Sequence, residues 1–271
     1  MSDKSKQHIA RLPLNLSFSK SWLEYLFKFV SNSETIHEGI YIADARMVFV
    51  SDPFSIQELW DHGNFGKGNL SRSKPDYEKR MSRISGDMMD SVENAKECLC
   101  LNLVEAFFLT YSLGCLRVYD TMGNIMSIEK CWSEFSHKES HLSLENVPPA
   151  AAPNNPFITS YVAYHYYRSR RWVVRSGLSY GVDYVLYRKG PEYDHAPYAV
   201  VVIPVESGIS HSLYTWHWLA TLSRVSGQVN KSVVICYVYI PSIKYSSPLC
   251  LDQYRVREVM VKRWIPERNR D

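Results

Sequence analysis

Residues 198–205 read YAVVVIPV, a near-continuous apolar run in a chain of 271 residues. Such a run is typical of a strand that is buried on both faces, in a sheet that has helices on either side. Residues 233–240 read VVICYVYI and predict a second buried strand. Between them, residues 215–225 (TWHWLATLSRV) read as a helix. This half of the chain is therefore expected to centre on two buried strands and a covering helix.

The sequence on either side extends the same pattern. A helix is predicted before the first strand, at residues 156–171, and further strands are predicted at residues 172–175, 182–188 and 256–264. The resulting order of helix, three strands, helix and two strands is that of an α/β sandwich. We expect a mixed central sheet flanked by helices, so the fold class is α/β in the broad sense that includes α+β.

The N-terminal half predicts a smaller α/β domain. Residues 39–51 (GIYIADARMVFVS) predict two short strands around a polar turn at Asp44. Residues 63–75 (GNFGKGNLSRSKP) read as a loop, and residues 76–97, which are mostly polar and charged, read as a flexible insertion. Helices are predicted at residues 17–32, 53–61, 101–116 and 128–135, the last with Ser127 as its cap.

A segment rich in proline, asparagine and alanine, residues 136–155, separates the two halves. Such a segment propagates neither helix nor sheet, so the domain boundary is placed there. The predicted organisation is an N-terminal extension with a helix (1–37), an N-terminal domain (38–150) and a C-terminal domain (151–271).

Composition places the chain among ordinary soluble globular proteins. Hydrophobic residues make up 45% and charged residues 22%, which argues against a disordered or fibrous protein. No window approaches the roughly 18 uninterrupted apolar residues that a membrane span needs, and the first residues lack the apolar run of a secretory signal. The six cysteines are scattered, with only Cys98 and Cys100 close together, so neither a zinc site nor disulfides are expected.

Charge is distributed unevenly along the chain. Residues 1–150 carry 16 Lys and Arg against 20 Asp and Glu, a net charge of −4, whereas residues 151–271 carry 15 against 8, a net charge of +7. This asymmetry indicates that the C-terminal half faces a polyanion. The alternative is that two solvated surfaces simply differ, and charge alone does not exclude it.

Common catalytic motifs give no reaction class. The glycines of GNFGKG (63–68) lack the strand-to-helix transition and the hydroxyl after the lysine that a phosphate-binding P-loop needs. A dinucleotide fingerprint and a nucleophile elbow of the type G-x-S-x-G are also missing. What remains is residues 177–198 (GLSYGVDYVLYRKGPEYDHAPY), where polar aromatic and functional side chains are unusually dense.

This stretch resembles the tRNA-splicing endonucleases, in particular the subunit that cuts the 5′ splice site in eukaryotes. Three further motifs match in order, GNFGKGNLSRSKP (63–75), LNLVEAFFLTYSLGCL (101–116) and YHYYRSRRWVVRSGLSYGVD (164–183). The resemblance covers about residues 38–75 and 99–264. It implies a metal-independent RNA lyase that cuts precursor tRNA at the 5′ splice site to remove the intron. The implied products carry 2′,3′-cyclic phosphate and 5′-OH ends.

The resemblance also implies three catalytic residues. In that family a Tyr ends one strand, a His begins the next and a Lys opens a later strand, and Tyr187, His195 and Lys231 occupy these positions. Attack by the 2′-OH of the substrate needs a base near that hydroxyl, an acid at the departing 5′ oxygen and a cation for the charge on the phosphorane. An unperturbed histidine has a pKa of about 6.5 and suits the acid, so His195 is given that role, and Lys231 suits the cation. Tyr187 is provisionally the base, since a neighbouring ammonium would lower its pKa from about 10, or it only orients the nucleophile.

RNA-binding residues and partners follow from the same resemblance. Arg224 and Trp264 match an arginine and an aromatic that clamp a flipped bulge base in the opposite active site. The structural alternative is that Arg224 is a helix-surface charge and Trp264 an edge-strand anchor. The implied partners are precursor tRNA, a second catalytic subunit and two structural subunits that complete a heterotetramer, with an RNA kinase as an optional addition. No cofactor, metal ion or membrane is implied, and the family is mostly nuclear.

Other basic and aromatic residues have expected roles of their own. His165, Trp216, His217 and Trp218 lie on predicted helices with apolar periodicity and are expected to pack. The apolar strands at 233–240 and 256–264 are the expected surface for pairing with another subunit. Candidates for diffuse phosphate contacts are Arg168, Arg170, Arg171, Arg255, Arg257, Lys262 and Arg263.

Each candidate catalytic residue also has a purely structural explanation. Tyr187 could pack at a strand end, His195 could form a local hydrogen bond in a loop, and Lys231 could be a solvated strand end. Two alternative functions stand beside the lyase. One is a non-catalytic scaffold subunit of the same complex. Such a subunit is expected to lack part of the catalytic trio, which consists of Tyr187, His195 and Lys231. The other is a metal-dependent nuclease with Asp183 and Glu206 as ligands and Lys231 as its lysine.

Overall fold

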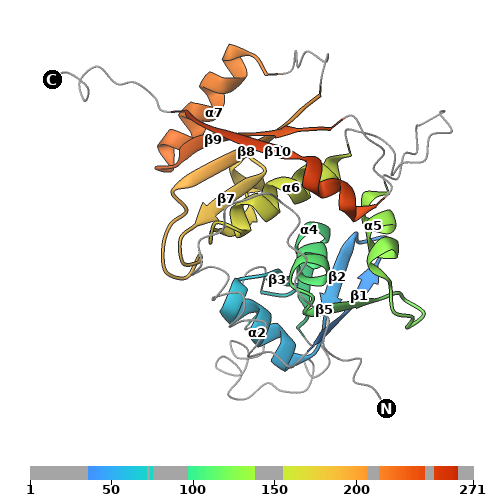
Figure 1. The fold of residues 1–271 in the computed structure, drawn as a ribbon. Helices are drawn as coiled ribbons and strands as arrows, with labels where there is room; N and C mark the ends of the chain where they lie inside the picture. The colour runs from blue at the N-terminus through green and yellow to red at the C-terminus, as the bar shows by residue number, and fades with distance from the viewer. Residues whose placement is uncertain are drawn as a thin grey trace, which may run out of the picture. The chain divides into compact units, whose positions relative to one another are not determined.

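The computed structural model describes residues 36–71, 74–75, 97–137, 155–206, 214–241 and 247–261. These residues fall into two units, one that ends at His137 and one that begins at Asn155, and Figure 1 shows the elements of both. The predicted helix at 17–32, almost all of the predicted insertion at 76–97 and the predicted boundary near residue 150 lie outside them. None of the described helices is long and apolar enough to span a membrane.

Among the described residues, the first unit contains a five-stranded sheet in the order β3–β4–β2–β1–β5. β1 and β5 run parallel, and the other neighbouring strands are antiparallel. The two strands predicted within residues 39–51 are confirmed as β1 and β2, and the predicted domain start at residue 38 falls inside β1. The strands are β1 (His37–Ile42), β2 (Met47–Val50), β3 (Lys67–Gly68), β4 (Leu99–Asn102) and β5 (Leu116–Tyr119).

The predicted loop at residues 63–75 contains β3, so that prediction is wrong over Lys67–Gly68. Gly66 precedes this short strand with a φ of +65°, and a Cβ there would lie 2.8 Å from the carbonyl oxygen of Cys100 in β4. Glycine therefore allows the backbone to approach β4 closely. A composition typical of loops gave no sign of this close pairing.

Two helices of the first unit begin where the sequence predicts. α2 (Pro53–Gly63) is capped by the Asp52 carboxylate, and α5 (Ile128–Ser136) is capped by the Ser127 hydroxyl. In both caps a side-chain oxygen accepts a hydrogen bond from a backbone N–H of the first turn, which otherwise has no partner in the helix. These contacts explain why each helix starts at a defined residue.

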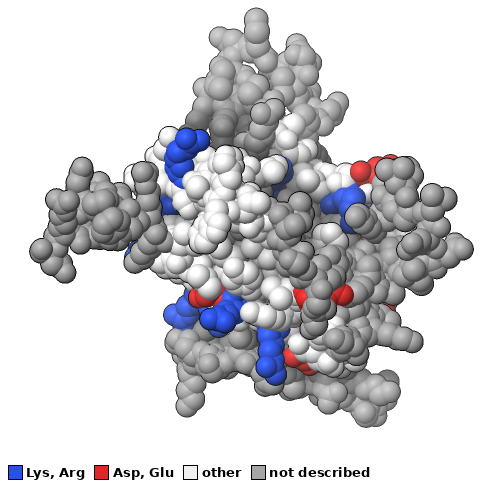
Figure 2. Space-filling view, turned by 90° about the horizontal axis from the view of Figure 1, so that it is seen from above, with Lys and Arg blue, Asp and Glu red and all other residues white. Residues whose placement is uncertain are grey.

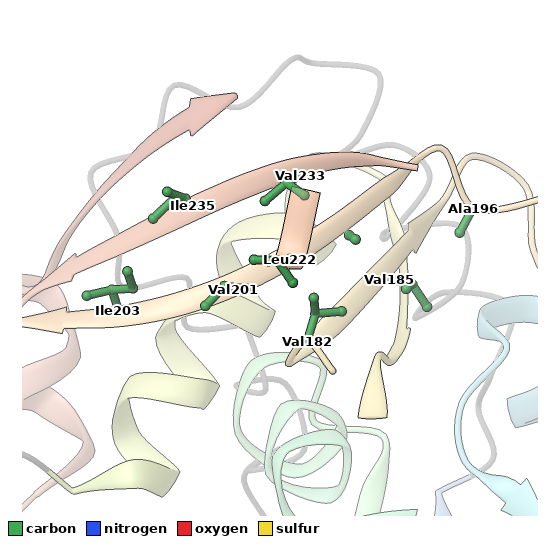
Figure 3. Close-up of a cluster of buried hydrophobic side chains, with 9 residues drawn as sticks. Val182, Val185, Ala196, Val201, Ile203, Leu222, Val233 and Ile235 are labelled. Atoms are coloured by element: carbon green, nitrogen blue, oxygen red, sulfur yellow. The ribbon is translucent and has the colours of Figure 1, made fainter. Parts of the chain in front are cut away.

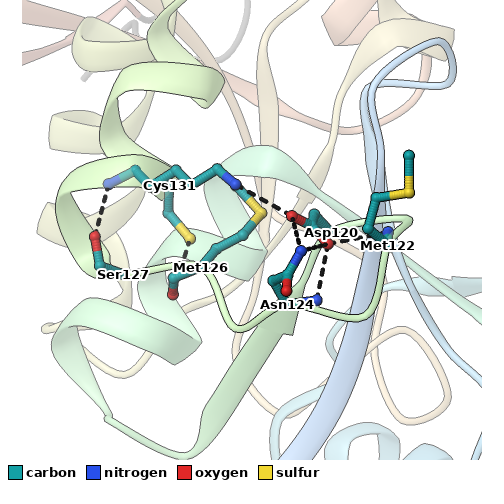
Figure 4. A network of polar contacts seen from close by, with 7 residues as sticks. Asp120, Met122, Asn124, Met126, Ser127 and Cys131 are labelled. Carbon is teal, nitrogen blue, oxygen red and sulfur yellow. Dashed lines mark hydrogen bonds and ion pairs between the residues drawn. The ribbon is translucent and has the colours of Figure 1, made fainter.

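The turn before α5 holds a dense polar network, which Figure 4 shows. The Asp120 carboxylate accepts hydrogen bonds from the backbone N–H groups of Met122 (3.0 Å) and Asn124 (2.8 Å) and lies 3.2 Å from the Lys130 ammonium. The bond from the Asn124 backbone contributes most to lowering the pKa of Asp120 to about 2. The carboxylate is therefore charged at neutral pH and ties the turn to the first residues of α5.

The helix predicted at residues 101–116 is wrong at both ends. Residues 101 and 102 complete β4, which pairs with β2, and Leu116 begins β5. The helical part consists of α4 (Leu103–Phe107) and a π-helical segment, η1 (Phe108–Ser112). Asn102 and Glu105 form a capping box at its start, in which each side chain accepts a hydrogen bond from the other residue's backbone N–H. Strand pairing thus overrides the local helical periodicity at both ends.

The second unit contains a five-stranded sheet in the order β10–β9–β8–β7–β6, again counted over the described residues. β8 and β9 are parallel, and the other neighbours are antiparallel. The predicted order of helix, three strands, helix and two strands is confirmed. The elements are α6 (Pro156–Arg168), β6 (Val173–Ser176), η3 (Leu178–Tyr180), β7 (Tyr184–Tyr187), β8 (Tyr198–Val205), α7 (Trp216–Gln228), β9 (Ser232–Tyr239), η4 (Pro248–Gln253) and β10 (Arg255–Val261).

Alternation along the strands gives this sheet two different faces, each covered by a helix. On one face Leu222 of α7 packs into a buried cluster, drawn in Figure 3. On the other face the Tyr184 hydroxyl donates a hydrogen bond to the Ser160 carbonyl oxygen of α6 at 3.0 Å. The mixed sheet flanked by helices is therefore as predicted. The cluster consists of Val182, Val185, Ala196, Ala199, Val201, Ile203, Leu222, Val233 and Ile235.

The prediction that four aromatic residues pack on helices is half right. His165 is buried in α6, and the Trp218 ring packs edge-on against Tyr214 with ring centres 5.0 Å apart. Trp216 is instead 85% exposed, and His217 is exposed as well. Both exposed residues lie in the first turn of α7.

Candidate active site

Three strand ends that carry predicted catalytic residues meet at one edge of the second sheet. β8 and β9 are parallel and begin together, with Tyr198 paired to Ser232, and β7 ends beside the start of β8. Tyr187 is the last residue of β7, His195 lies in the loop before β8, and Lys231 immediately precedes β9. The parallel pairing of β8 and β9 is therefore what brings these segments to the same edge.

Two contacts hold the Lys231 side chain. Its Nζ donates a hydrogen bond to the carbonyl oxygen of Ala196 at 3.0 Å. The same atom lies 4.8 Å from the centre of the Tyr180 ring, within the range of a cation–π interaction. Because Ala196 follows His195 in the sequence, this hydrogen bond holds the ammonium against the backbone next to His195. Burial lowers the pKa of Lys231, since the charged form loses hydration.

His195 is exposed at the end of an ordered turn. The Gly190 carbonyl oxygen accepts hydrogen bonds from the backbone N–H groups of Tyr193 and Asp194, both at 3.2 Å. On the other side Ala196 is 2% exposed and belongs to the buried cluster. The backbone of His195 is thus fixed from both sides, while its imidazole remains accessible to a large substrate.

Tyr187 is half-buried and packs against the same cluster. Burial raises its pKa, the neighbouring Tyr180 phenol adds to this effect, and the Arg175 guanidinium opposes it. The expectation that a neighbouring ammonium lowers this pKa is therefore wrong, because burial outweighs the positive charge nearby. The phenol stays neutral at neutral pH, which favours orienting a nucleophile over acting as its base.

Sequence reasoning missed two residues that lie beside the trio. Tyr180 contacts Lys231 and affects the pKa of Tyr187, and its sequence signal is a tyrosine between two glycines in GLSYG (177–181). Arg175 of β6 pairs with Val185 of β7, so alternation places it on the same face of the sheet as Tyr187. It brings a second positive charge to the site.

The structure describes only one of the two predicted RNA-binding residues. Arg224 is exposed on α7, two residues after Leu222, which points into the buried cluster. Trp264 lies outside the described residues. The clamp formed by these two side chains therefore stays a prediction.

The expected diffuse phosphate contacts need one correction. Arg168 is 8% exposed, and its Nε donates a hydrogen bond to the Tyr164 hydroxyl at 2.9 Å, so the expectation is wrong for this residue. Arg170 is exposed and lies over the Tyr166 ring, 3.5 Å from its centre. On the face that Figure 2 presents, Lys and Arg lie around the margin of a broad area of other residues, and several of them are close together at the lower left.

The alternative metal site does not assemble. Glu206 follows the end of β8, whereas Lys231 lies beside its start, so the two are separated by the length of an eight-residue strand, on the order of 25 Å. The Asp183 Oδ2 accepts a hydrogen bond from the Val202 N–H at 2.7 Å and is engaged in fixing the backbone. No group of three or more His, Cys, Asp or Glu side chains among the described residues could hold a metal ion.

Two family models match the chain in the same order as its two units. Residues 157–245 match the model described as tRNA intron endonuclease, catalytic C-terminal domain. Residues 44–132 match tRNA intron endonuclease, N-terminal domain. The first match contains Tyr187, His195 and Lys231.

Curated relatives agree with the family models. The tRNA-splicing endonuclease subunit Sen2 of Rattus norvegicus is 41% identical over 181 residues, which cover 64% of this chain and 36% of the relative. The tRNA-splicing endonuclease subunit Sen2-2 of Arabidopsis thaliana is 32% identical over 80% of this chain and 81% of the relative. The probable tRNA-splicing endonuclease subunit sen2 of Schizosaccharomyces pombe is 27% identical over 96% and 94%. The chain thus spans about a third of the rat relative and most of the other two.

Proposed function

Because this chain belongs to the tRNA intron endonuclease family, we propose that it is a catalytic subunit that cleaves precursor tRNA at the 5′ splice site. The 2′-OH of the nucleotide before the cut attacks the adjacent phosphorus, the bond from phosphorus to the 5′ oxygen breaks, and the intron is released after a second cut elsewhere. The products carry a 2′,3′-cyclic phosphate and a 5′-OH. The step uses functional groups of the RNA and the protein, with water as the acceptor of the 2′ proton.

The three residues divide the work of this step. Lys231 stabilises the negative charge that gathers on the phosphate oxygens. His195 donates a proton to the departing 5′ oxygen. Its exposed position lets the imidazole reach the sugar-phosphate backbone of a substrate as large as precursor tRNA. Tyr187 orients the 2′-OH through its neutral phenol, and the 2′ proton leaves to water. Arg175 adds positive charge on the same face of the sheet.

One observation carries this proposal. The hydrogen bond from Lys231 Nζ to the Ala196 carbonyl oxygen joins the segment before β9 to the residue after His195. A solvated strand end has no need for such a contact, and a scaffold subunit has no need for all three residues. The arrangement supports a catalytic role for the chain.

The proposal extends to partners and location. The names of the relatives describe subunits of a tRNA-splicing endonuclease, which supports action within a multi-subunit complex on precursor tRNA. We propose a nuclear heterotetramer with a second catalytic subunit and two structural subunits, and an RNA kinase as an optional partner. Arg224 and Trp264 clamp a flipped bulge base at the opposite active site, where a guanidinium and an indole can stack on any base.

Reconstitution tests the reaction directly. The full chain is assembled with the second catalytic subunit and the structural subunits, incubated with an intron-containing precursor tRNA, and the position and end groups of each cut are mapped. We expect a 5′ cut with a 2′,3′-cyclic phosphate end that persists in excess EDTA. Loss of the 5′ cut in EDTA, or a 3′-OH end at that cut, would overturn the proposal in favour of a metal-dependent nuclease.

A further inference from the structure

We propose that Tyr180 is a positioning residue of this site. Its ring holds the Lys231 ammonium at the end of the sheet where β7 finishes with Tyr187. This inference rests on the proposed function, because that function makes Lys231 the cation beside the scissile phosphate. Tyr180 itself contacts the lysine and not the reacting atoms. Its effect on cleavage is expected to pass entirely through Lys231.

The lysine needs support from more than one direction. A lysine side chain has a flexible four-carbon stem and a compact charge, so one hydrogen bond leaves its ammonium several rotamers. The bond to the Ala196 carbonyl oxygen at 3.0 Å comes from the loop before β8. The Tyr180 ring, 4.8 Å from Nζ, comes from η3, a separate segment between β6 and β7. Together the two contacts fix the position of the charge.

Tyr180 is itself held by a closed turn. The Gly177 carbonyl oxygen accepts hydrogen bonds from the N–H groups of Tyr180 (2.8 Å) and Val182 (3.3 Å), and the Gly177 N–H donates to the Asp183 carbonyl oxygen at 2.9 Å. The Asp183 carboxylate then accepts from the Val202 N–H at 2.7 Å, which ties the turn to β8. The Tyr180 ring therefore has a defined place relative to the sheet.

The same ring also lies beside Tyr187. Tyr180 packs against the buried cluster that Tyr187 contacts, and its phenol is close enough to add to the effect of burial in raising the pKa of Tyr187. One side chain thus contacts or neighbours two of the three proposed catalytic groups.

The test compares variants of the full chain in the reconstituted complex, by single-turnover cleavage of precursor tRNA at the 5′ site with saturating enzyme. Tyr180→Leu removes the ring and is expected to lower the rate constant about tenfold, equivalent to about 1.4 kcal/mol. Tyr180→Phe keeps the ring and is expected to stay within about twofold of the unmodified protein. In a Lys231→Ala background, Tyr180→Leu is expected to have no further effect.

Tyr214→Leu is the matched control, because Tyr214 packs against the same buried cluster. It is expected to cleave within about twofold of the unmodified protein. The inference is overturned if Tyr180→Phe loses as much activity as Tyr180→Leu, if the loss persists in the Lys231→Ala background, or if Tyr214→Leu shows the same loss. Unchanged cleavage by Lys231→Ala alone would instead overturn the proposed function, so the two failures are distinguishable.

Discussion

The ammonium of Lys231 and the carbonyl oxygen of Ala196 lie 3.0 Å apart, and this hydrogen bond joins the segments that enter the two parallel strands. A second bond runs beside it, from the Ser232 N–H to the Pro197 carbonyl oxygen at 2.9 Å. The two bonds fix the distance between the backbone of His195 and the positive charge before a substrate arrives. Groups placed in advance need no reorganisation when charge develops on the substrate.

His195→Ala is expected to lower the rate of cleavage at the 5′ site by about a hundredfold or more, because the departing 5′ oxygen loses its proton donor. Since the side chain is exposed, folding and assembly are expected to be unchanged, as judged by circular dichroism and size-exclusion chromatography. His217→Ala removes an exposed histidine of α7 and serves as the control. A His195→Ala complex that cuts the 5′ site at the normal rate would remove the assignment.

Arg224→Ala is expected to slow cleavage mainly at the partner's site, because the guanidinium is proposed to stack on a base there. The measurement is the rate of each cut separately on one precursor tRNA. Arg224→Lys keeps the charge but loses the planar group, so it is expected to rescue little of the loss. Equal slowing of both cuts, or full rescue by lysine, would contradict the clamp.

Gly177→Ala is expected to destabilise the protein by about 1–3 kcal/mol. A Cβ at Gly177 would lie 2.8 Å from the Val182 carbonyl oxygen, so the turn that carries Tyr180 must shift. Gly227→Ala is the matched control, because a Cβ at this position in α7 meets nothing within 4 Å. In a helix, alanine is favoured over glycine by about 0.5–1 kcal/mol, so the control is expected to be slightly stabilised. Urea unfolding measures both, and equal midpoints for the two variants would count against the argument.

Stability is expected to fall in acid because of His165. Burial lowers the pKa of His165 from 6.5 to about 4. The unfolded chain therefore takes up a proton as the pH falls below about 6.5, whereas the folded chain does so only near pH 4. The free energy of unfolding is expected to fall by about 3 kcal/mol across this window, and the contribution is fully present only above it.

His165→Phe removes the titrating group and keeps an aromatic ring, so its free energy of unfolding is expected to change less between pH 7 and pH 4.5. Tyr161→Phe is the control, since it removes the contact between the Tyr161 hydroxyl and His165 Nδ1 (3.3 Å) but leaves the imidazole. Urea unfolding at a series of pH values measures all three proteins. Parallel pH curves for His165→Phe and the unmodified chain would show that another group is responsible.

Much of the second unit could be predicted because its signals are local. The apolar run at 198–205 coincides with β8, since a strand buried on both faces must be apolar throughout. The helix predicted at 215–225 begins within one residue of α7, because Thr215 is a good cap and its hydroxyl accepts the Trp218 N–H at 3.2 Å. Residues next to each other in the sequence determine such boundaries, so the boundaries can be predicted from the sequence.

The remainder depended on contacts between distant segments. β4 forms because residues 99–102 pair with β2, which lies far away in the sequence, so periodicity around Leu101 was misleading. In the site, the order of the helices and strands predicts that Tyr187, His195 and Lys231 lie at or beside strand ends. It does not predict the contact between Tyr180 and Lys231. The raised pKa of Tyr187 was equally hidden, because burial depends on how α7 and the sheet pack.

β8 and β9 begin at residues that pair with each other, so the number of residues between α7 and β9 decides on which side of the sheet Lys231 lies. Lys231 is the last residue of the short turn between α7 and β9. The Lys231 N–H donates a hydrogen bond to the Ser226 carbonyl oxygen at 2.9 Å. By alternation, Lys231 shares a side of the sheet with Val233 and Ile235. One extra residue between Lys231 and Ser232, with β9 still in register on β8, would move the lysine back by one position and turn its amine toward the face that α6 covers. A single added codon is thus expected to abolish cleavage while β8 and β9 keep their pairing.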